Sequence, residues 1–162
     1  MNSPATAVDL TDIGSMIRAA YAAISGPAGA PRDWATDRLL HHPLARLMPT
    51  RPASGGGSTI EVFDIEGYIA SRTPYFASTD FHEVEIARQE FRFGNIASVL
   101  SSYESRHTPD GPPFGRGVNC FQFWWDGTRW WVMSILWDNE REAVFLPPEL
   151  EKREAQDVRR EK

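Results

Sequence analysis

Three charged side chains in the second half of the chain have types and spacing that suit acid–base chemistry. Glu104 and Arg106 are two residues apart in a stretch rich in β-formers, so they share one strand face, and Asp138 lies near the end of another such stretch. Two acids and an arginine in one cavity can orient a water molecule or abstract a proton, provided that burial raises the pKa of the base. They are our candidate catalytic residues. The alternative is an ion pair on the rim of the sheet, which contributes little to stability.

Two further polar residues and one aromatic residue are candidate ligand-binding groups. Arg116 and Asn119 lie in the neighbouring β-rich stretch, where they can join either arrangement. Five of the six tryptophans fall between positions 124 and 137. We expect most of them in the core or in an interface, but a large flat ring can also orient an aromatic ligand, and Trp137 is our candidate for that role.

Composition excludes several classes of function. With 17 Lys and Arg against 22 Asp and Glu, the net charge is −5, which argues against nucleic-acid binding. The single cysteine, Cys120, cannot form an internal disulfide or a thiolate metal cluster, so we expect a reducing compartment, the cytoplasm. No phosphate-binding, dinucleotide, nucleophile-elbow or zinc-protease motif occurs, and we expect no cofactor and no metal. No apolar run approaches the length of a membrane span, and the first residues do not resemble a secretory signal, so we expect no membrane association.

The first half of the chain predicts helices. Apolar residues recur at helical spacing over 8–24, and Ser25-Gly26-Pro27 ends the run. A second helical stretch opens at Pro31 and ends before Pro43. A short strand at 45–48, a loose loop at 49–58 and a strand at 59–63 follow. Asp64 is then a plausible N-cap of a third helix, which Pro74 should interrupt.

The second half predicts antiparallel sheet. We expect strands at about 81–93, 95–107, 115–125 and 129–138, with the Asp126-Gly127 pair forming a tight hairpin turn. Long strands must twist and coil, so such a sheet curves around its helices and leaves a cavity at its open end. The chain is therefore expected to be one α+β domain over 1–146. A charged tail, 147–162, should form a solvated helix or a frayed end.

Four segments carry a resemblance to a known superfamily. They are the opening helix at 17–24, His42-Pro43-Leu44-Ala45, the strand entry at 94–99 and the hairpin at 126–132. In this order they resemble the nuclear transport factor 2-like superfamily, which includes ketosteroid isomerase, scytalone dehydratase, limonene epoxide hydrolase and SnoaL-type cyclases. The resemblance covers roughly 8–142 and implies a cystatin-like cone, in which N-terminal helices pack in a strongly curved, mainly antiparallel sheet. Many relatives carry an acid where Leu44 stands, so the chemistry of that acid is not expected here.

The resemblance also implies roles for particular residues. His42 occupies the His-Pro position, where it either bonds the end of the sheet or serves as a pocket acid or base. Tyr21 and Tyr68 come from helices that face the cavity in this fold. A tyrosine hydroxyl there can donate to a carbonyl oxygen, although a plain core role is the alternative. The candidate set Glu104, Arg106 and Asp138 is loosely similar to the acid–arginine–acid set of limonene epoxide hydrolase, in inverted order.

The last strand has two apolar faces. Alternation places Trp130, Val132, Ser134, Leu136 and Asp138 on one face and Trp131, Met133, Ile135 and Trp137 on the other. A second apolar face needs a cover, and the superfamily's usual cover is the same sheet of another subunit. We therefore expect a homodimer through the sheet, the alternative being a cover formed by the chain's own tail.

Two functions follow from these expectations. The leading one is a cofactor-independent site for a hydrophobic small molecule, in which an isomerase, dehydratase, cyclase or hydrolase works by acid–base chemistry, or in which the molecule is only bound. The alternative is a non-catalytic dimeric module for ligand binding or assembly, whose cavity is structural.

Overall fold

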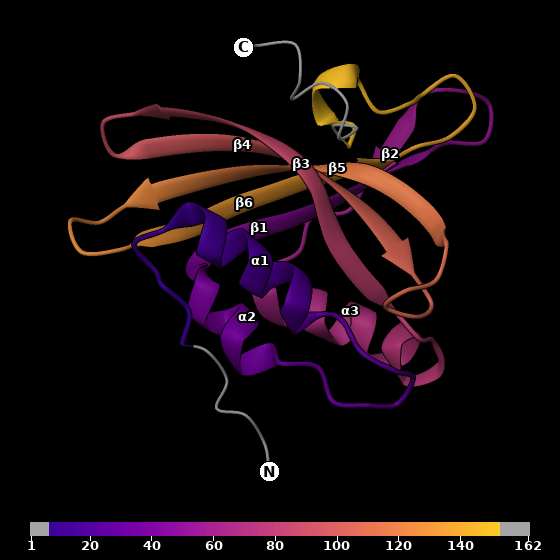
Figure 1. Cartoon of the computed structure of the whole chain (residues 1–162), viewed down its shortest axis with the longest axis horizontal. Coiled ribbons are helices and arrows are strands. Elements are labelled where there is room, and N and C mark those ends of the chain that lie inside the picture. The colour runs from indigo at the N-terminus through magenta and orange to yellow at the C-terminus, as the bar shows by residue number, and fades with distance from the viewer. Residues whose placement is uncertain (1–6, 153–162) are drawn as a thin grey trace, which may run out of the picture.

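Three helices lie on one side of a six-stranded mixed sheet (Figure 1), so the predicted α+β fold class is confirmed. The computed structural model describes residues 7–152 of the 162. The elements run in the order α1 (Ile13–Ala23), α2 (Trp34–Leu40), β1 (His41–Pro52), β2 (Ser58–Ile60), α3 (Ile65–Ser78), β3 (His82–Phe93), β4 (Ile96–Arg106), β5 (Pro113–Trp125), β6 (Trp130–Asn139) and the short 3₁₀ helix η1 (Pro148–Leu150).

The sheet has the strand order β2-β1-β6-β5-β4-β3. The β1–β6 pair is parallel and every other pair is antiparallel. Figure 1 shows the sheet curving over α1, with all three helices beneath it and η1 on the opposite side. The sheet therefore has a concave face that packs on the helices and a convex face that does not.

Local sequence signals account for the helix starts. The carboxylates of Asp12, Asp33 and Asp64 each accept a hydrogen bond from the backbone N–H three residues further on, as N-caps do. From α1, the fully buried Ile13, Met16 and Ile17 enter the core against the concave face of the sheet. This apolar stripe fixes the helix in the curve of the sheet.

Strand β1 is longer than expected. The sequence predicted a strand at 45–48 and a loose loop at 49–58, but β1 runs to Pro52 and pairs with β2 from Thr50 onward. Only the tip, with Gly55, Gly56 and Gly57 at positive φ, is a turn. The three glycines therefore form a tight turn between paired strands and not the long loop that their sequence predicts.

Helix α3 continues past Pro74, contrary to the sequence-based expectation. Phe76, beyond the proline, is buried, and its ring lies 6.0 Å from that of Trp34 and 5.3 Å from that of Phe81. Packing of this aromatic cluster outweighs the hydrogen bond that proline removes.

A bulge in β6 corrects the predicted division of its faces. Gln122 pairs with Ser134 but Phe123 pairs with Val132, so Met133 is an extra residue in β6. Beyond the bulge the alternation is reversed. Ile135 and Trp137 consequently share the concave side with Val132, a placement that strict alternation excludes.

The described part of the charged tail is docked on the sheet. Ser102 Oγ donates to the carbonyl oxygen of Leu150 at 2.6 Å, and Leu150 is buried. The solvated or frayed state expected for the tail is therefore corrected for 147–152, while 153–162 lie outside the described residues. Within 7–152, each helix is too short or too polar to cross a bilayer.

Candidate functional site

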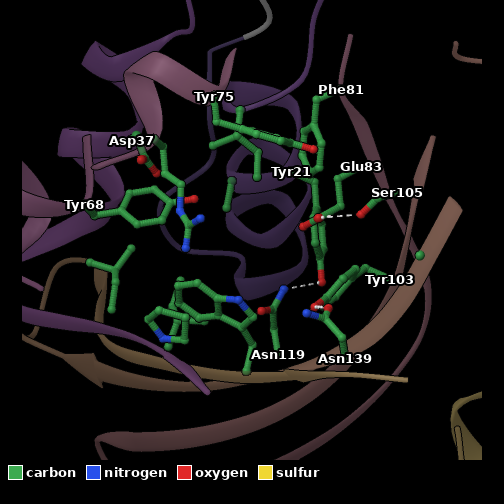
Figure 2. A pocket seen from close by; sticks show the side chains of 18 of the residues that line it. Tyr21, Asp37, Tyr68, Tyr75, Phe81, Glu83, Tyr103, Ser105, Asn119 and Asn139 are labelled. Atoms are coloured by element: carbon green, nitrogen blue, oxygen red, sulfur yellow. Dashed lines mark hydrogen bonds between the residues drawn. The ribbon is translucent and has the colours of Figure 1, made fainter. Parts of the chain in front are cut away.

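A cavity of about 420 Å³ lies between the helices and the concave face of the sheet. Its walls combine aromatic rings with a small number of polar side chains, as small-molecule sites do. Figure 2 shows Asp37 and Tyr68 on one side of this cavity and Glu83, Ser105 and Tyr103 on the other.

Four of the predicted site residues line this cavity. Tyr21 comes from α1, Tyr68 from α3, Asn119 from β5 and Trp137 from β6. The edge of the Tyr68 ring meets Trp137, with their centroids 6.1 Å apart. Trp137 reaches the cavity because of the bulge in β6. Their roles toward a ligand remain predictions.

Three other predicted residues lie on the convex face instead. On β4, Tyr103 and Ser105 line the cavity, so the alternating Glu104 and Arg106 point away from it. Glu104 forms ion pairs with Arg106 and with Lys152 of the docked tail. These two residues thus realise the ion-pair alternative, and the expectation that they face the cavity is corrected.

Arg116 shares their face of the sheet and is also paired. Its guanidinium donates to Glu140 and to Glu151 at 2.9 to 3.0 Å, two bonds to each carboxylate. It holds the C-terminal segment onto β5 and does not line the cavity.

Asp138 and His42 also lie outside the cavity. Asp138, beyond the bulge, pairs with Arg141 at 2.9 Å. His42 packs edge-on between Trp124 and Trp131, at ring distances of 5.8 and 5.5 Å, and its Nδ1 accepts the backbone N–H of Leu44. The bulge explains the position of Asp138. His42 points outward because 41 and 42 begin a strand, where adjacent side chains face opposite ways.

His41 takes the place in the cavity wall that was expected for His42. Its Nδ1 lies 2.8 Å from the backbone oxygen of Asp37 and 3.5 Å from that residue's carboxylate. A carbonyl oxygen only accepts, so Nδ1 carries the hydrogen and Nε2 of the neutral ring is basic. His41 Nε2 and Asp37 Oδ2 are buried without a hydrogen-bond partner among residues 7–152. Burial raises the pKa of Asp37, an effect that His41 opposes.

Glu83, at the start of β3, is a further titratable group in the wall. Its carboxylate accepts one side-chain hydrogen bond, from Ser105 Oγ at 3.0 Å. Burial raises the pKa of Glu83 to about 7, against the opposing effects of the Ser105 bond and the charge of Arg72. A carboxyl group with this pKa can both take and give a proton near neutral pH.

The tyrosine hydroxyls in the wall differ in their engagement. Tyr103 donates to Asn139 Oδ1 at 2.6 Å, and Tyr21 is bonded to Ser101 and Asn119. The Tyr68 hydroxyl makes no hydrogen bond to any described residue. Burial raises the pKa of Tyr68, so its hydroxyl stays protonated and is a donor that a ligand can use.

Aromatic side chains close the open end of the cavity. Rings of Tyr75, Phe81 and Phe114 follow one another at distances of 6.0 and 6.2 Å, and all three line the cavity. Tyr75 and Phe114 are also exposed to solvent, which places them at the mouth. These three side chains form an aromatic rim on this side of the cavity.

Asp37, His41 and Glu83 were missed because no motif marks them. Asp37 and His41 are four residues apart, a spacing that suggests a helical pair, yet the helix ends between them. Glu83 was placed within a strand, but only the sheet register sets it opposite Ser105. Strand alternation predicts that Glu83 and Glu85 share one face of the sheet, but it does not predict which face that is. Nothing in the chain says which face is concave.

None of the described residues forms a group of three or more His, Cys, Asp or Glu side chains that could hold a metal ion. His41 and Asp37 are the nearest such pair in the cavity wall, and they bond to each other.

Comparisons with known proteins identify the fold. No family model matches the sequence, and no curated protein matches it. A structure of a protein of unknown function from Mycobacterium tuberculosis is similar, with a TM-score of 0.59 and 10% identity over 85% of this chain and 80% of that chain. An NTF2-like protein of unknown function from Silicibacter pomeroyi has a TM-score of 0.53 and 14% identity over 79% and 92%. A Shewanella frigidimarina protein, provisionally named a ketosteroid isomerase, has a TM-score of 0.53 and 13% identity over 77% and 93%.

At these identities the likeness concerns the fold alone. The chain has the NTF2-like fold, also called cystatin-like, as the sequence resemblance implied. Because this fold hosts unrelated functions, the chemistry must be argued from the cavity itself.

Proposed function

We propose that this chain is an enzyme that performs cofactor-independent acid–base chemistry on a hydrophobic small molecule, as an isomerase, dehydratase, cyclase or hydrolase. One observation carries the proposal: Glu83 and the His41–Asp37 pair are enclosed in the wall of a single aromatic cavity. Burial of an ionisable group such as Glu83, which has no ion pair within 7–152, costs free energy, so a purely structural cavity has no use for it. One protein of similar structure is provisionally named a ketosteroid isomerase, which is compatible with this chemistry.

The cavity suits a flat hydrophobic molecule with one or two polar groups. Its volume of about 420 Å³ falls within the range of small-molecule sites. Phe76, Phe121 and Trp137 provide apolar surface, while Asn119 and Tyr68 offer hydrogen bonds. Such an arrangement fixes the orientation of an aromatic ligand by its polar substituents.

The titratable groups divide the chemistry between two walls. An ionised Glu83 accepts a proton from the ligand, and Tyr68 donates a hydrogen bond to an oxygen on which negative charge develops. On the wall formed by α2 and β1, His41 returns a proton through Nε2, with Asp37 stabilising its charged form. Proton removal and proton return at different atoms are what an isomerisation or a dehydration requires.

Two simple probes test the proposal. In D₂O without added cofactor, 2-tetralone reports proton abstraction as deuterium uptake beside its carbonyl, and styrene oxide reports water activation as diol formation. We expect the wild type to catalyse at least one reaction, and Glu83→Gln to lower its rate by about 100-fold or more. The matched control is Glu142→Gln, at an exposed turn residue, which should leave the rate unchanged. Binding of both probes without turnover would contradict the proposal and favour a binding module.

We also propose that the chain forms a homodimer through the convex face of the sheet. Five exposed apolar residues form a convex patch there: Phe91, Phe93, Ile96, Trp124 and Leu136. The first three lie at the β3–β4 hairpin, and Ile96 pairs with Trp124 across β4 and β5. The polar pair Gln122 and Ser134 lies between Trp124 and Leu136 on this face. Exposed apolar side chains on neighbouring strands suit a partner surface, and an interface of about 800 Å² per subunit would be ordinary.

The convex patch is equally compatible with the alternative function, a non-catalytic dimeric module for ligand binding or assembly. In that case the cavity would bind a molecule or stay empty, and Glu83→Gln would change no reaction rate. Turnover of a probe separates the two functions, since both include the dimer.

The proposed compartment is the cytoplasm. Cys120 is the only cysteine and is a free thiol, and burial raises the pKa of this thiol. A chain that uses no disulfide suits a reducing environment.

A further inference from the structure

A series of hydrogen bonds connects the cavity, through residues of α1 and β4, to β3. Asn119 Nδ2 donates to the hydroxyl of Tyr21 at 3.0 Å, a bond drawn in Figure 2. The Tyr21 and Ser101 hydroxyls are 2.8 Å apart, and Ser101 Oγ donates to Glu85 Oε2 at 2.5 Å. Asn119 and Tyr21 line the main cavity. Glu85 lines a second cavity, of about 540 Å³, between α1 and β3, and Tyr21 and Glu83 line this second cavity as well as the main one.

All hydrogen bonds in this series have the same donor-to-acceptor direction. Ser101 has one hydroxyl hydrogen, and it goes to the carboxylate of Glu85. The hydrogen between Tyr21 and Ser101 must therefore come from Tyr21. Each hydrogen bond in the series is therefore donated in the direction that leads from the main cavity to the Glu85 carboxylate.

Burial shields Tyr21 and Ser101, in the middle of this series of hydrogen bonds, from solvent, but it does not shield Glu85 at the end of the series. Ser101 is fully buried and Tyr21 is 4% exposed, so the hydrogen bond between them is shielded from solvent. The Glu85 side chain is 14% exposed, and Arg88 pairs with it at 2.7 Å beside the second cavity. A proton that reaches Glu85 can leave to solvent from there.

The Tyr21 hydroxyl has a different role from the one expected from the sequence. Its hydrogen is committed to Ser101 and one of its lone pairs accepts from Asn119, so it presents only its second lone pair, as an acceptor, to the main cavity. A hydroxyl that accepts on one side and donates on the other is the element from which proton relays are built.

We propose that Tyr21, Ser101 and Glu85 form a proton relay that joins the main cavity to the second cavity. An acidic O–H or N–H group of a ligand bound in the main cavity gives its proton to Tyr21 as Tyr21 passes its own to Ser101 and Ser101 passes its own to Glu85, and the ligand is left as its conjugate base. Three bonds to hydrogen break and three form, no electron is transferred, and the net result is one proton moved onto the Glu85 carboxylate. The reverse sequence reloads the cavity. The relay rests on the proposed function in that it would reset the protonation of an acid–base site.

The substitution Glu85→Gln distinguishes a proton relay from a hydrogen-bond network that serves only stability. The glutamine side-chain oxygen can accept the bond from Ser101, but an amide oxygen does not take up a proton near neutral pH. Glu85→Gln can therefore keep the bond from Ser101, while it removes the proton acceptor and the oxygen to which Arg88 donates. A network that serves only stability would continue to work with this residue.

Exchange of tyrosine hydroxyl hydrogens with solvent tests the relay without any substrate. The chain has four tyrosines, so the full-length protein labelled with ¹³C at the ring carbon that bears the hydroxyl gives few signals. In an equal mixture of H₂O and D₂O, the deuterium isotope shift of each signal reports the exchange rate of that hydroxyl. We expect Glu85→Gln to slow exchange at Tyr21 by about 100-fold, the scale of a positioned proton-transfer group.

Two controls make the measurement specific. Tyr103, whose hydroxyl bonds to Asn139 outside the relay, should exchange at the same rate in Glu85→Gln as in the wild type. Glu90→Gln, a substitution on the same strand that leaves the relay intact, should change neither tyrosine. Ser101→Ala removes the middle hydroxyl and should also slow Tyr21. Because that substitution leaves Tyr21 without its acceptor, Glu85→Gln remains the decisive variant.

The outcomes separate the relay from the catalytic proposal. Selective slowing at Tyr21 supports the relay. An unchanged Tyr21 rate in Glu85→Gln overturns it, as does an equal change at Tyr21 and Tyr103, which would indicate general opening of the fold. Loss of turnover in Glu83→Gln is measured separately and bears on the proposed function alone.

Discussion

Glu83 and Glu104 lie on neighbouring strands and meet opposite environments. In the β3–β4 register Glu83 faces Ser105, and Glu104 faces Val84. Glu104, on the convex face, pairs with Arg106 and Lys152. Glu83, on the concave face, has the hydroxyl of Ser105 and no ion pair within 7–152. Glu83 lies opposite Ser105, the residue next to Glu104, so one position along β4 separates the ion-paired carboxylate of Glu104 from the cavity that holds Glu83.

The same contrast holds for the two faces as a whole. On the convex face Arg116 binds two carboxylates and thereby docks the C-terminal segment. In the concave cavity the pKa values of Asp37 and Glu83 are raised, mainly by burial. Charges on the convex face therefore stabilise the fold, while those in the cavity reduce stability and are available for chemistry.

The largest predicted effect on stability concerns Glu83. In the unfolded chain its pKa is near 4.5, and in the folded chain it is about 7, so its charged form opposes folding increasingly as the pH rises from 4.5 to 7. Glu83→Gln should therefore raise the free energy of unfolding at pH 8 by up to about 3 kcal/mol, and change it little at pH 4. Urea denaturation at both pH values measures this. A variant that is less stable than wild type at pH 8 would mean that the cavity is not a low-dielectric site.

Arg116→Met tests the opposite face. Removal of the guanidinium leaves Glu140 and Glu151 without their shared partner and should cost about 2 kcal/mol of stability, the scale of hydrogen bonds between charged groups. Hydrogen exchange should become faster at the amide of Leu146, which bonds to Glu140, and at that of Leu150. Unchanged protection at both amides would show that the tail is held by its other contacts, such as the bond from Ser102 to Leu150.

Phe93→Ser tests the convex patch. Phe93 is 83% exposed in the single chain, so its loss should leave the stability of the monomer within about 0.5 kcal/mol of wild type. Dimerisation should weaken by about tenfold, which corresponds to about 1.4 kcal/mol. Light scattering of the wild type at micromolar concentration should give twice 18.3 kDa. A monomeric wild type would refute the proposed dimer.

Arg141→Met should have the smallest effect and calibrates the one at Arg116. Arg141 pairs with Asp138, but their side chains are 36% and 44% exposed, so solvent screens the pair. The expected loss of stability is below about 0.5 kcal/mol by the same urea measurement. A loss equal to that of Arg116→Met would remove the distinction between a docking residue and a surface ion pair.

Much of the fold could be predicted because it depends on local patterns. The cap at Asp64, the Asp126-Gly127 turn and the four long strands follow from residue types at short spacing. The cavity residues Tyr21 and Tyr68 could be named from the resemblance of the chain to a known fold, since a helix position carries over between related folds.

The candidate site was less predictable because side-chain direction depends on the register of the sheet. The extra residue Met133 reverses the faces of β6, which carries Trp137 into the cavity and leaves Asp138 outside. The end of α2 at Leu40 makes 41 and 42 strand residues, so His41 points inward and His42 outward. Neither event has a distinctive sequence signal.

By itself, the sequence determined the α+β class, the order of most elements and the two apolar faces of the sheet, because these follow from the periodicity of apolar residues. Only the tertiary structure decided which face is concave, where β6 is bulged and that helix α3 continues through Pro74. Those features arise from packing between segments far apart in the chain. They place Glu83 and His41 in the cavity and Glu104 on the convex face, which is why the chemistry of the site could not be read from spacing alone.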